Sequence, residues 1–181
     1  MKLVREHINE ISLGGSNLDR MGVGMKETIK RWLDKHNVKN YIINDDLTID
    51  TIDTYSSRGN VNLREVNIPD FIKFKHIAGF LDLSYTSITS LSDDLQVDWW
   101  LDLNHSKITS LPNGLKVGGS LNLWNTPITS LPNGLKVGHN LNISYTTITT
   151  LPADLYVIGM IIRDKNIIIK DNVEGSLKQL T

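Results

Sequence analysis

The feature that most constrains this chain is a sequence that restarts every 20 residues from Leu81 onward. Four consecutive copies span residues 81–160, namely LDLSYTSITSLSDDLQVDWW, LDLNHSKITSLPNGLKVGGS, LNLWNTPITSLPNGLKVGHN and LNISYTTITTLPADLYVIGM. The stretch Ile108–Gly118 is identical to Ile128–Gly138, which indicates duplication. Because one such unit cannot bury its own apolar face, neighbouring copies must share a core, and the sequence predicts a solenoid.

Each copy fits the unit L-x-L-x-x-T-x-I-x-x-L-P-x-x-L-x-V. Side chains alternate along a strand, so Leu121 and Leu123 should point into the core while Asn122 and Trp124 point outward. Proline opposes a continuing strand, so each Leu-Pro pair should begin the return segment. The apolar residues expected to close the core from that segment are, in the third copy, Ile128, Leu131, Leu135 and Val137.

Small and polar residues are predicted to shape the turns between these segments. Asn113-Gly114 and Gly118-Gly119 have the permissive backbone that turns require. One hydroxyl residue follows each strand, and we interpret this column as a buried ladder that hydrogen-bonds the backbone of the turn. Its members are Thr86, Ser106, Thr126 and Thr146.

The repeat changes at both ends, as a solenoid requires. The stretch 61–80 retains the apolar positions Val61, Leu63, Ile68, Phe71 and Ile77 but lacks the Leu-Pro pair. Upstream, Leu47–Asp50 is predicted to be the first edge strand. Downstream, Arg163 stands at a core position, which is typical of a polar end cap. About five or six strands are expected in all.

The first 46 residues have helical rather than repeat character. Leu3, Val4, His7, Ile8 and Ile11 form one helical stripe. Met25, Ile29, Trp32, Leu33 and His36 form a second stripe, with Gly22 and Gly24 before it and Asn37 after it. These helices are interpreted either as a cap docked on the first strand or as a separable docking element. The predicted organisation is a helical cap (1–46), a solenoid (47–160) and a C-terminal cap (161–181).

The repeats resemble the short bacterial-type leucine-rich repeats, which are built on L-x-L-x-x-x-x-I-T-x-L-P and occur in secreted effectors of Gram-negative pathogens and in small bacteriophage proteins. The N-terminal region resembles that of the bacteriophage proteins in three segments, VREHINE (4–10), MGVGMKETIKRWLDKHNVKNY (21–41) and INDDLTID (43–50). The resemblance implies an α/β leucine-rich-repeat solenoid with parallel strands on the concave face, an extended or turn convex side and an N-terminal helical cap. It also implies protein binding. The catalytic Cys of the effector ubiquitin ligases has no counterpart, since the chain contains no Cys.

The charge balance and the lengths of the apolar runs argue against two classes of partner, nucleic acids and membranes. Lys and Arg number 19 against 20 Asp and Glu, which gives no basic footprint for nucleic acid. No apolar run approaches the roughly 20 residues that cross a bilayer, and the N-terminus does not read as a secretory signal. We therefore expect no nucleic-acid or membrane partner and a cytoplasmic location, which is the host cell cytoplasm if the protein is phage-encoded.

The sequence predicts no enzyme, no cofactor and no metal site. The 5 His residues form no HExxH motif, and no glycine-rich phosphate loop occurs. Asp82 and Asp102 should lie about 5 Å apart on adjacent strands. Two such carboxylates could share a proton or hold a cation, but we favour a solvated acidic column.

The outward positions of the strands form the candidate partner-binding surface. Large aromatic residues stand there although Ser and Asn serve equally well in other copies, and Trp and Tyr are favoured at binding hot spots. Alternatively, Phe80 and Trp100 pack against the N-terminal helices or cover an edge. The candidate residues are Phe80, Asp82, Tyr85, Trp100, Asp102, Asn104, His105, Asn122, Trp124 and Tyr145.

The function predicted from these observations is that of a phage-encoded module that binds a host or viral protein. Inhibition of host machinery or defence is implied by the resemblance alone. A virion-associated or assembly role and a secreted effector are the alternatives. The concave strands offer roughly 300 Å², whereas a stable interface buries about 800 Å² per partner. A partner must therefore also use flanking loops, the helices or a second copy, and the sequence leaves monomer and homo-oligomer open.

Overall fold

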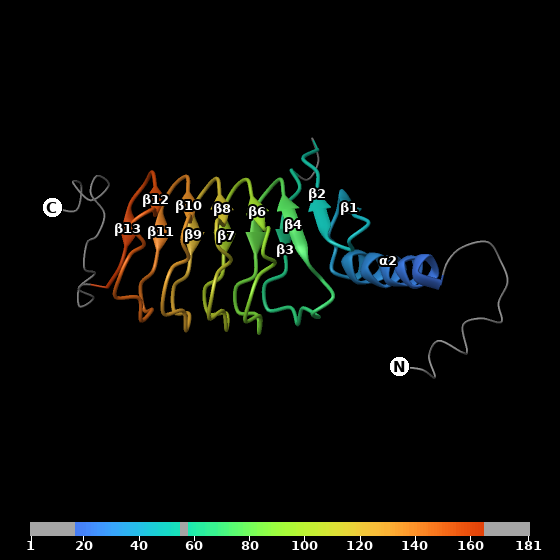
Figure 1. Ribbon diagram of the computed structural model, residues 1–181, viewed down its shortest axis with the longest axis horizontal. Coiled ribbons are helices and arrows are strands. Elements are labelled where there is room, and N and C mark those ends of the chain that lie inside the picture. The colour runs from blue at the N-terminus through green and yellow to red at the C-terminus, as the bar shows by residue number, and fades with distance from the viewer. Residues whose placement is uncertain (1–16, 55–57, 165–181) are drawn as a thin grey trace.

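The computed structural model describes residues 17–54 and 58–164. Successive coils of the chain stack in a row along the longest dimension, and one helix lies at the N-terminal end of the row (Figure 1). The predicted repeat solenoid with a helical cap is confirmed. The first predicted helix, over Leu3–Ile11, lies outside the described residues.

One parallel sheet follows the Leu-x-Leu positions of the repeat. Leu81 lies opposite Leu101, and Leu101 lies opposite Leu121, so neighbouring strands are in register at 20-residue spacing. Six strands make up this sheet, whereas about five or six were expected in all, and a second sheet adds further strands. The six strands are β3 (Val61–Asn62), β5 (Leu81–Asp82), β7 (Leu101–Asp102), β9 (Leu121–Asn122), β11 (Leu141–Asn142) and β13 (Ile161–Ile162).

A second sheet, of seven strands, was not predicted from the sequence. The return segments were expected to be extended or to form turns. Where the return segments of successive coils are extended at the same position, they pair as parallel strands. Its outermost strand is antiparallel to the next, so the segment Leu47–Asp50, predicted to form the first edge strand, instead contributes to an internal strand of this sheet. The strands are β1 (Tyr41–Ile43), β2 (Ile49–Thr51), β4 (Phe74–Ile77), β6 (Gln96–Val97), β8 (Lys116–Val117), β10 (Lys136–Val137) and β12 (Tyr156–Val157).

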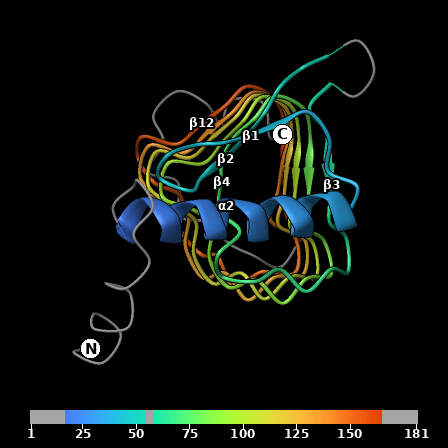
Figure 2. The same ribbon diagram turned by 90° about the vertical axis from the view of Figure 1, so that its right-hand side faces the viewer.

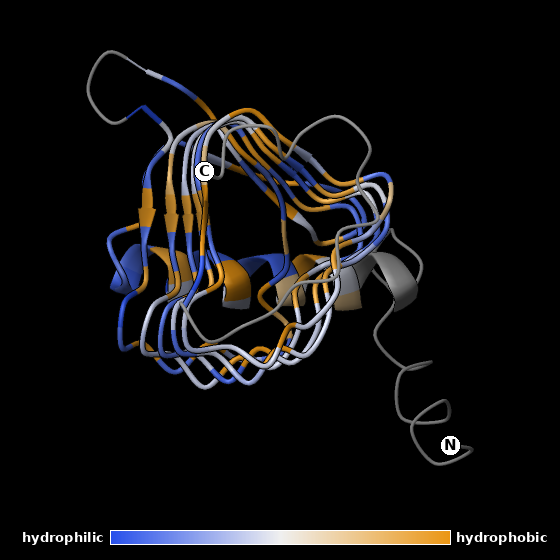
Figure 3. Ribbon diagram, turned by 90° about the vertical axis from the view of Figure 1, so that its left-hand side faces the viewer, coloured by the Kyte–Doolittle hydropathy of each residue, from blue (hydrophilic) through white to orange (hydrophobic). Residues whose placement is uncertain are grey.

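The core runs through the inside of the coils. Apolar residues recur at the same points of successive coils (Figure 3). In the third copy the residues predicted to point inward are all buried, namely Leu121, Leu123, Ile128, Leu131, Leu135 and Val137. In the stretch before the regular copies, Val61, Leu63 and Ile77 are buried as predicted, whereas Ile68 and Phe71 are partly exposed.

The predicted hydroxyl ladder is buried in all four copies. In three of them, Thr86, Thr126 and Thr146, the hydroxyl donates a hydrogen bond of 2.7 Å to the carbonyl oxygen three residues earlier. Among the described residues, Ser106 differs, because its buried hydroxyl oxygen has no hydrogen-bond partner. The ladder therefore satisfies the turn backbone in three of the copies.

The glycines of the Asn113-Gly114 and Gly118-Gly119 pairs have different roles. Gly114, with φ of 70°, has the left-handed backbone predicted for the Asn-Gly turn. Gly118 does not need glycine for its φ; it is required because a β-carbon there would overlap the carbonyl oxygen of Asp98 in the preceding coil. The prediction that Gly118 serves as a turn residue through its flexible backbone is therefore corrected to close packing between coils.

The second predicted helix exists but is longer than expected. Helix α2 (Asn17–Lys35) continues through Gly22 and Gly24, which were expected to precede it. It ends at the predicted place, and Asn37 beyond it has a left-handed φ of 58°. The helix lies across the end of the solenoid (Figure 2), with Ile29 and Leu33 fully buried.

The C-terminal end replaces a backbone contact with a side chain. In the preceding coils the residue after each outward position donates its N–H to the next coil's carbonyl, as from His105 to Trp124 at 3.1 Å. Tyr145 instead donates its N–H to the carboxylate of Asp164. Arg163, predicted to be the polar residue of the cap, is half-buried beside it.

Candidate functional site

The outer face of the six-stranded sheet, together with the turns that follow its strands, carries the sequence-predicted site residues. We call this surface the ladder face. Equivalent residues of successive coils lie beside one another on it, because the strands are parallel and in register. The face therefore consists of columns, each with one residue per coil.

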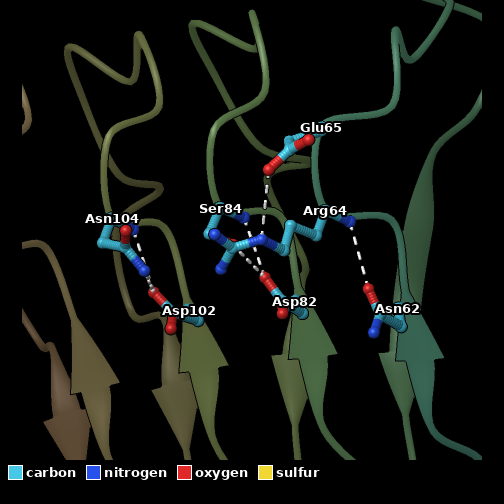
Figure 4. Close-up of polar contacts among 7 residues, drawn as sticks. All are labelled: Asn62, Arg64, Glu65, Asp82, Ser84, Asp102 and Asn104. Carbon is cyan, nitrogen blue, oxygen red and sulfur yellow. Dashed lines mark hydrogen bonds and ion pairs between the residues drawn. The ribbon is translucent and has the colours of Figure 1, made fainter.

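The column that contains Asp82 and Asp102 has a structural role. In every copy the side-chain oxygen accepts the backbone N–H two residues further on, at 2.9 Å for both Ser84 and Asn104 (Figure 4). Oδ1 of Asp82 also accepts the Ser84 hydroxyl at 2.6 Å. The neutral members of the column, Asn62, Asn122 and Asn142, make the same backbone contact.

These contacts change the interpretation of both carboxylates. Oδ1 of Asp102 accepts the side-chain amides of Asn104 at 2.6 Å and Asn122 at 3.1 Å. An Asx side chain that caps a turn in this way is common wherever the chain reverses after a strand. Asp82, Asp102, Asn104 and Asn122, predicted as binding residues, therefore also hold the turns of the ladder face. The signal for this role was present in the sequence as an unbroken Asx column.

The next column has a left-handed backbone in every coil. Glu65, Tyr85, His105, Asn125 and Tyr145 have φ between 50° and 65°, at 61°, 58°, 54°, 53° and 56°. This region costs an L-residue roughly 1–2 kcal/mol and is most tolerable for Gly, Asn and Asp. The two tyrosines are therefore not the residues that the backbone prefers.

Aromatic side chains from two columns meet on this part of the ladder face. The Tyr85 and His105 rings stack with centroids 4.4 Å apart, and His105 meets Trp124 edge to face at 4.5 Å. Trp124 contacts Tyr145 at 5.5 Å, and the guanidinium of Arg64 lies over Tyr85 at 4.4 Å. The result is a continuous row across five coils, which we call the aromatic row. Its tyrosines remain exposed, by 44% for Tyr85 and 65% for Tyr145.

Phe80 and Trp100 form a separate pair at the other end of the strands. Their rings are nearly parallel, at 6° and 4.3 Å between centroids. Both are partly exposed, and their ring partner is each other. Neighbouring Trp99 is 49% exposed and lies under the guanidinium of Arg58 at 5.5 Å.

A groove opens beside Trp100. Its volume is about 690 Å³, and its lining residues come from three successive coils. Trp99, Trp100, Asp98, Asp102, Gly119 and Ser120 are among the residues that line it. Asp98 and Trp99 were not among the candidate residues predicted from the sequence.

Arg64 is the residue of the aromatic row that sequence reasoning missed. It stands in the column of Ser84, Asn104 and Trp124, so the only signal was its register with the regular copies. It also forms an ion pair with Glu65 at 3.3 Å (Figure 4). Because both groups are exposed, this pair contributes little to stability.

A polar cavity of about 650 Å³ lies away from the ladder face. Asp46, Lys75, Asp93 and Asp94 are among its lining residues, and Asp46 pairs with Lys75 at 3.7 Å. Hydrogen bonds from Thr48 hold the pKa of Asp46 below its usual value. Within residues 17–54 and 58–164, no group of three or more His, Asp or Glu is placed to hold a metal ion.

In the same described ranges, no helix combines the length and the apolar character that a membrane crossing needs. A comparison with protein-family models, curated proteins and solved structures finds no match for this chain.

Proposed function

We propose that this protein is a non-enzymatic binding module and that a protein partner docks on the ladder face. The observation that carries the proposal is the aromatic row, which places Tyr85, His105, Trp124 and Tyr145 side by side on the surface. Exposed Trp, Tyr and Arg are the residue types enriched at binding hot spots. They are partly pre-ordered by their mutual contacts, which lowers the entropy cost of binding.

The repeat itself argues that these residues serve something other than folding. The column of Trp124 holds Ser84, Asn104 and Ser144 in other coils, and the column of Trp100 holds Ser120. The backbone geometry is the same in all of them. Aromatic side chains are therefore dispensable for the coil and are retained, under this proposal, for a partner.

The interface must extend beyond the strands. The sheet alone offers roughly 300 Å², less than half of the roughly 800 Å² that each side of a stable interface buries. The aromatic row and the groove beside Trp100 flank the strands at their two ends and enlarge the continuous surface. A partner that spans both would reach a stable interface.

The resemblance to bacteriophage leucine-rich-repeat proteins supports a more specific proposal. Under it, the chain is phage-encoded and binds a host or viral protein in the host cytoplasm, where it inhibits host machinery or defence.

A virion-associated or assembly role is a second candidate, and one observation favours it. Met21, Val23 and Met25, near the start of α2, are exposed by 63%, 64% and 38%. Under this alternative, the helix anchors the solenoid to a larger assembly through these apolar side chains.

Affinity capture with substitutions borrowed from the repeat tests the primary proposal. Trp100→Ser with Trp124→Asn installs residues that other coils of this chain already hold at those positions. The matched control, Lys116→Gln with Lys136→Gln, follows Gln96 in the same column of the second sheet. Loss of a partner with the first variant and retention with the control supports docking on the ladder face. Retention with both variants contradicts it, and loss only on replacing Met21, Val23 and Met25 by Ser favours anchoring.

A further inference from the structure

The Phe80–Trp100 stack stops where the repeat changes. Phe80 and Trp100 occupy equivalent positions of successive coils, and their rings are 4.3 Å apart and nearly parallel. The next two coils hold Ser120 and Asn140 at that position. Phe80 covers one face of the indole, and within the described chain no ring covers the other face, which is directed toward the coil of Ser120.

The groove lies on that uncovered side. Gly118 and Gly119 line it from the following coil, and they contribute backbone but no side chain. Adjacent strands are about 4.8 Å apart, which is close to the spacing of the two stacked rings. A planar group placed on Trp100 would therefore continue the stack at the level of Ser120.

The negative charge of the groove favours a cationic planar group over an anionic one. Asp98, Asp102 and His139 are its ionisable lining residues, and within the described chain the lining includes no Lys or Arg. Oδ1 of Asp102 is engaged by Asn104 and Asn122, while Oδ2 has no partner among the described residues. A nucleotide that stacked its base on Trp100 would bring its negatively charged phosphate close to these carboxylates, which would repel it. A planar cation would be attracted by them.

Two contacts within this protein involve the same kind of cation. The guanidinium of Arg64 lies 4.4 Å from the centre of the Tyr85 ring, and that of Arg58 lies 5.5 Å from the ring of Trp99, which itself lines the groove. A guanidinium is planar and weakly hydrated, so it stacks on aromatic faces and pairs with carboxylates better than an ammonium does.

We propose that the groove beside Trp100 binds an arginine side chain of the partner protein, with its guanidinium stacked on the free face of the indole and paired with Asp102. Asp98, which His76 already contacts at 3.0 Å, adds negative charge at the rim. This inference rests on the proposed function and names the chemistry of one of its contacts. It predicts that the partner presents an exposed, arginine-bearing segment.

The test is a titration of the full-length protein with three blocked peptides that differ in one residue, Gly-Arg-Gly, Gly-Lys-Gly and Gly-citrulline-Gly. Citrulline has nearly the shape of arginine but no charge. The readout is the indole N–H signal of Trp100 in a two-dimensional NMR spectrum. We expect a saturable shift of this signal with the arginine peptide, and about fivefold to tenfold weaker binding of the citrulline peptide. Weaker binding of the lysine peptide than of the arginine peptide is also expected.

Substitutions taken from neighbouring coils locate the site. Trp100→Ser should abolish saturable shifts of the neighbouring backbone signals. Asp102→Asn keeps the turn, as Asn122 and Asn142 do, and should weaken arginine binding about fivefold while leaving the melting temperature nearly unchanged. Lys136→Gln, in strand β10 of the second sheet, is the control and should bind like wild type.

Three results would overturn the inference. These are equal binding of the arginine and citrulline peptides, unaltered binding in both the Trp100→Ser and Asp102→Asn variants, and a stronger Trp100 shift with a thymidine oligonucleotide than with the arginine peptide. If a partner is captured through the ladder face but the arginine peptide does not shift Trp100, this inference fails and the proposed function stands. If the arginine peptide binds as described but no partner is lost with the ladder-face variant, the proposed function fails instead.

Discussion

The phenol of Tyr41 lies 2.8 Å from Oδ1 of Asp34 and donates it a hydrogen bond, which joins the outermost strand β1 to helix α2. Oδ2 of the same carboxylate accepts the ammonium of Lys30 at 3.0 Å. Burial, together with the hydrogen bond to Asp34 and the negative charge of that carboxylate, raises the pKa of Tyr41 to about 12. The bond from Lys30, followed by that from Tyr41, lowers the pKa of Asp34. This cluster ties the helical cap to the solenoid.

The cluster predicts a loss of stability in alkali. The pKa of Tyr41 is about 12 in the folded chain against 10.0 for the free side chain. Between these values the unfolded chain gives up the phenolic proton first, so the stabilisation present below pH 10 disappears as the pH rises toward 12. We expect the stability difference between wild type and Tyr41→Phe to shrink over this range by at most about 1–2 kcal/mol, because the ring is only partly buried. Chemical denaturation at a series of pH values measures it, and a constant difference contradicts the assignment.

Ser106→Thr should stabilise the protein. Threonine at the three equivalent positions donates its hydroxyl to a carbonyl at 2.7 Å, whereas the Ser106 hydroxyl is buried without a partner. The added methyl restricts χ1 and favours the bonded rotamer. We expect a gain of about 1 kcal/mol in the free energy of unfolding. The reciprocal variant Thr126→Ser should lose stability, and a destabilised Ser106→Thr would show that this coil cannot accept the methyl group.

The left-handed column predicts an unusual order of stability at Tyr145, where φ is 56°. Tyr145→Asn and Tyr145→Val both remove the ring, so their difference reports on the backbone. Asn tolerates this region and a β-branched residue does not, so Tyr145→Val should be about 1 kcal/mol less stable than Tyr145→Asn. At Lys116 in strand β8 the order should reverse, because Val favours strands. Thermal melts of the Asn and Val variants at Tyr145 and at Lys116 measure both orders of stability. The same order at both positions would contradict the backbone argument.

Two glycine-to-alanine substitutions should act in opposite directions. A β-carbon at Gly118 would overlap the carbonyl oxygen of Asp98, so Gly118→Ala must push two coils apart. A cost of about 1–3 kcal/mol is expected from such overpacking. A β-carbon at Gly24 in α2 meets nothing within 4 Å, so Gly24→Ala should stabilise the helix by about 0.5–1 kcal/mol. Calorimetry measures both, and a neutral Gly118→Ala would show that the coils can shift apart at little cost.

Much of the fold could be predicted from the repeat, because the pattern encodes which side chains turn inward. Leu121, Leu123 and Ile128 are buried as expected, and so is the hydroxyl column. The second sheet could not be predicted from its short strands, since a two-residue segment such as Lys116–Val117 has no strand signal of its own and pairs only after the coils have stacked. The start of α2 was placed too late, because tertiary packing and the rest of the helix outweigh the propensity of two glycines.

The candidate site divides in the same way. The period, the inward and outward columns, and the aromatic residues that face outward in them follow from the amino-acid pattern. Which of these residues are neighbours depends on how the coils stack. Residues 20 positions apart, such as Tyr85 and His105, come into ring contact because parallel register places equivalent positions about one strand spacing apart. Which faces remain free, as at Trp100, depends on how each side chain packs against the adjacent coil, and that packing exists only in the assembled solenoid.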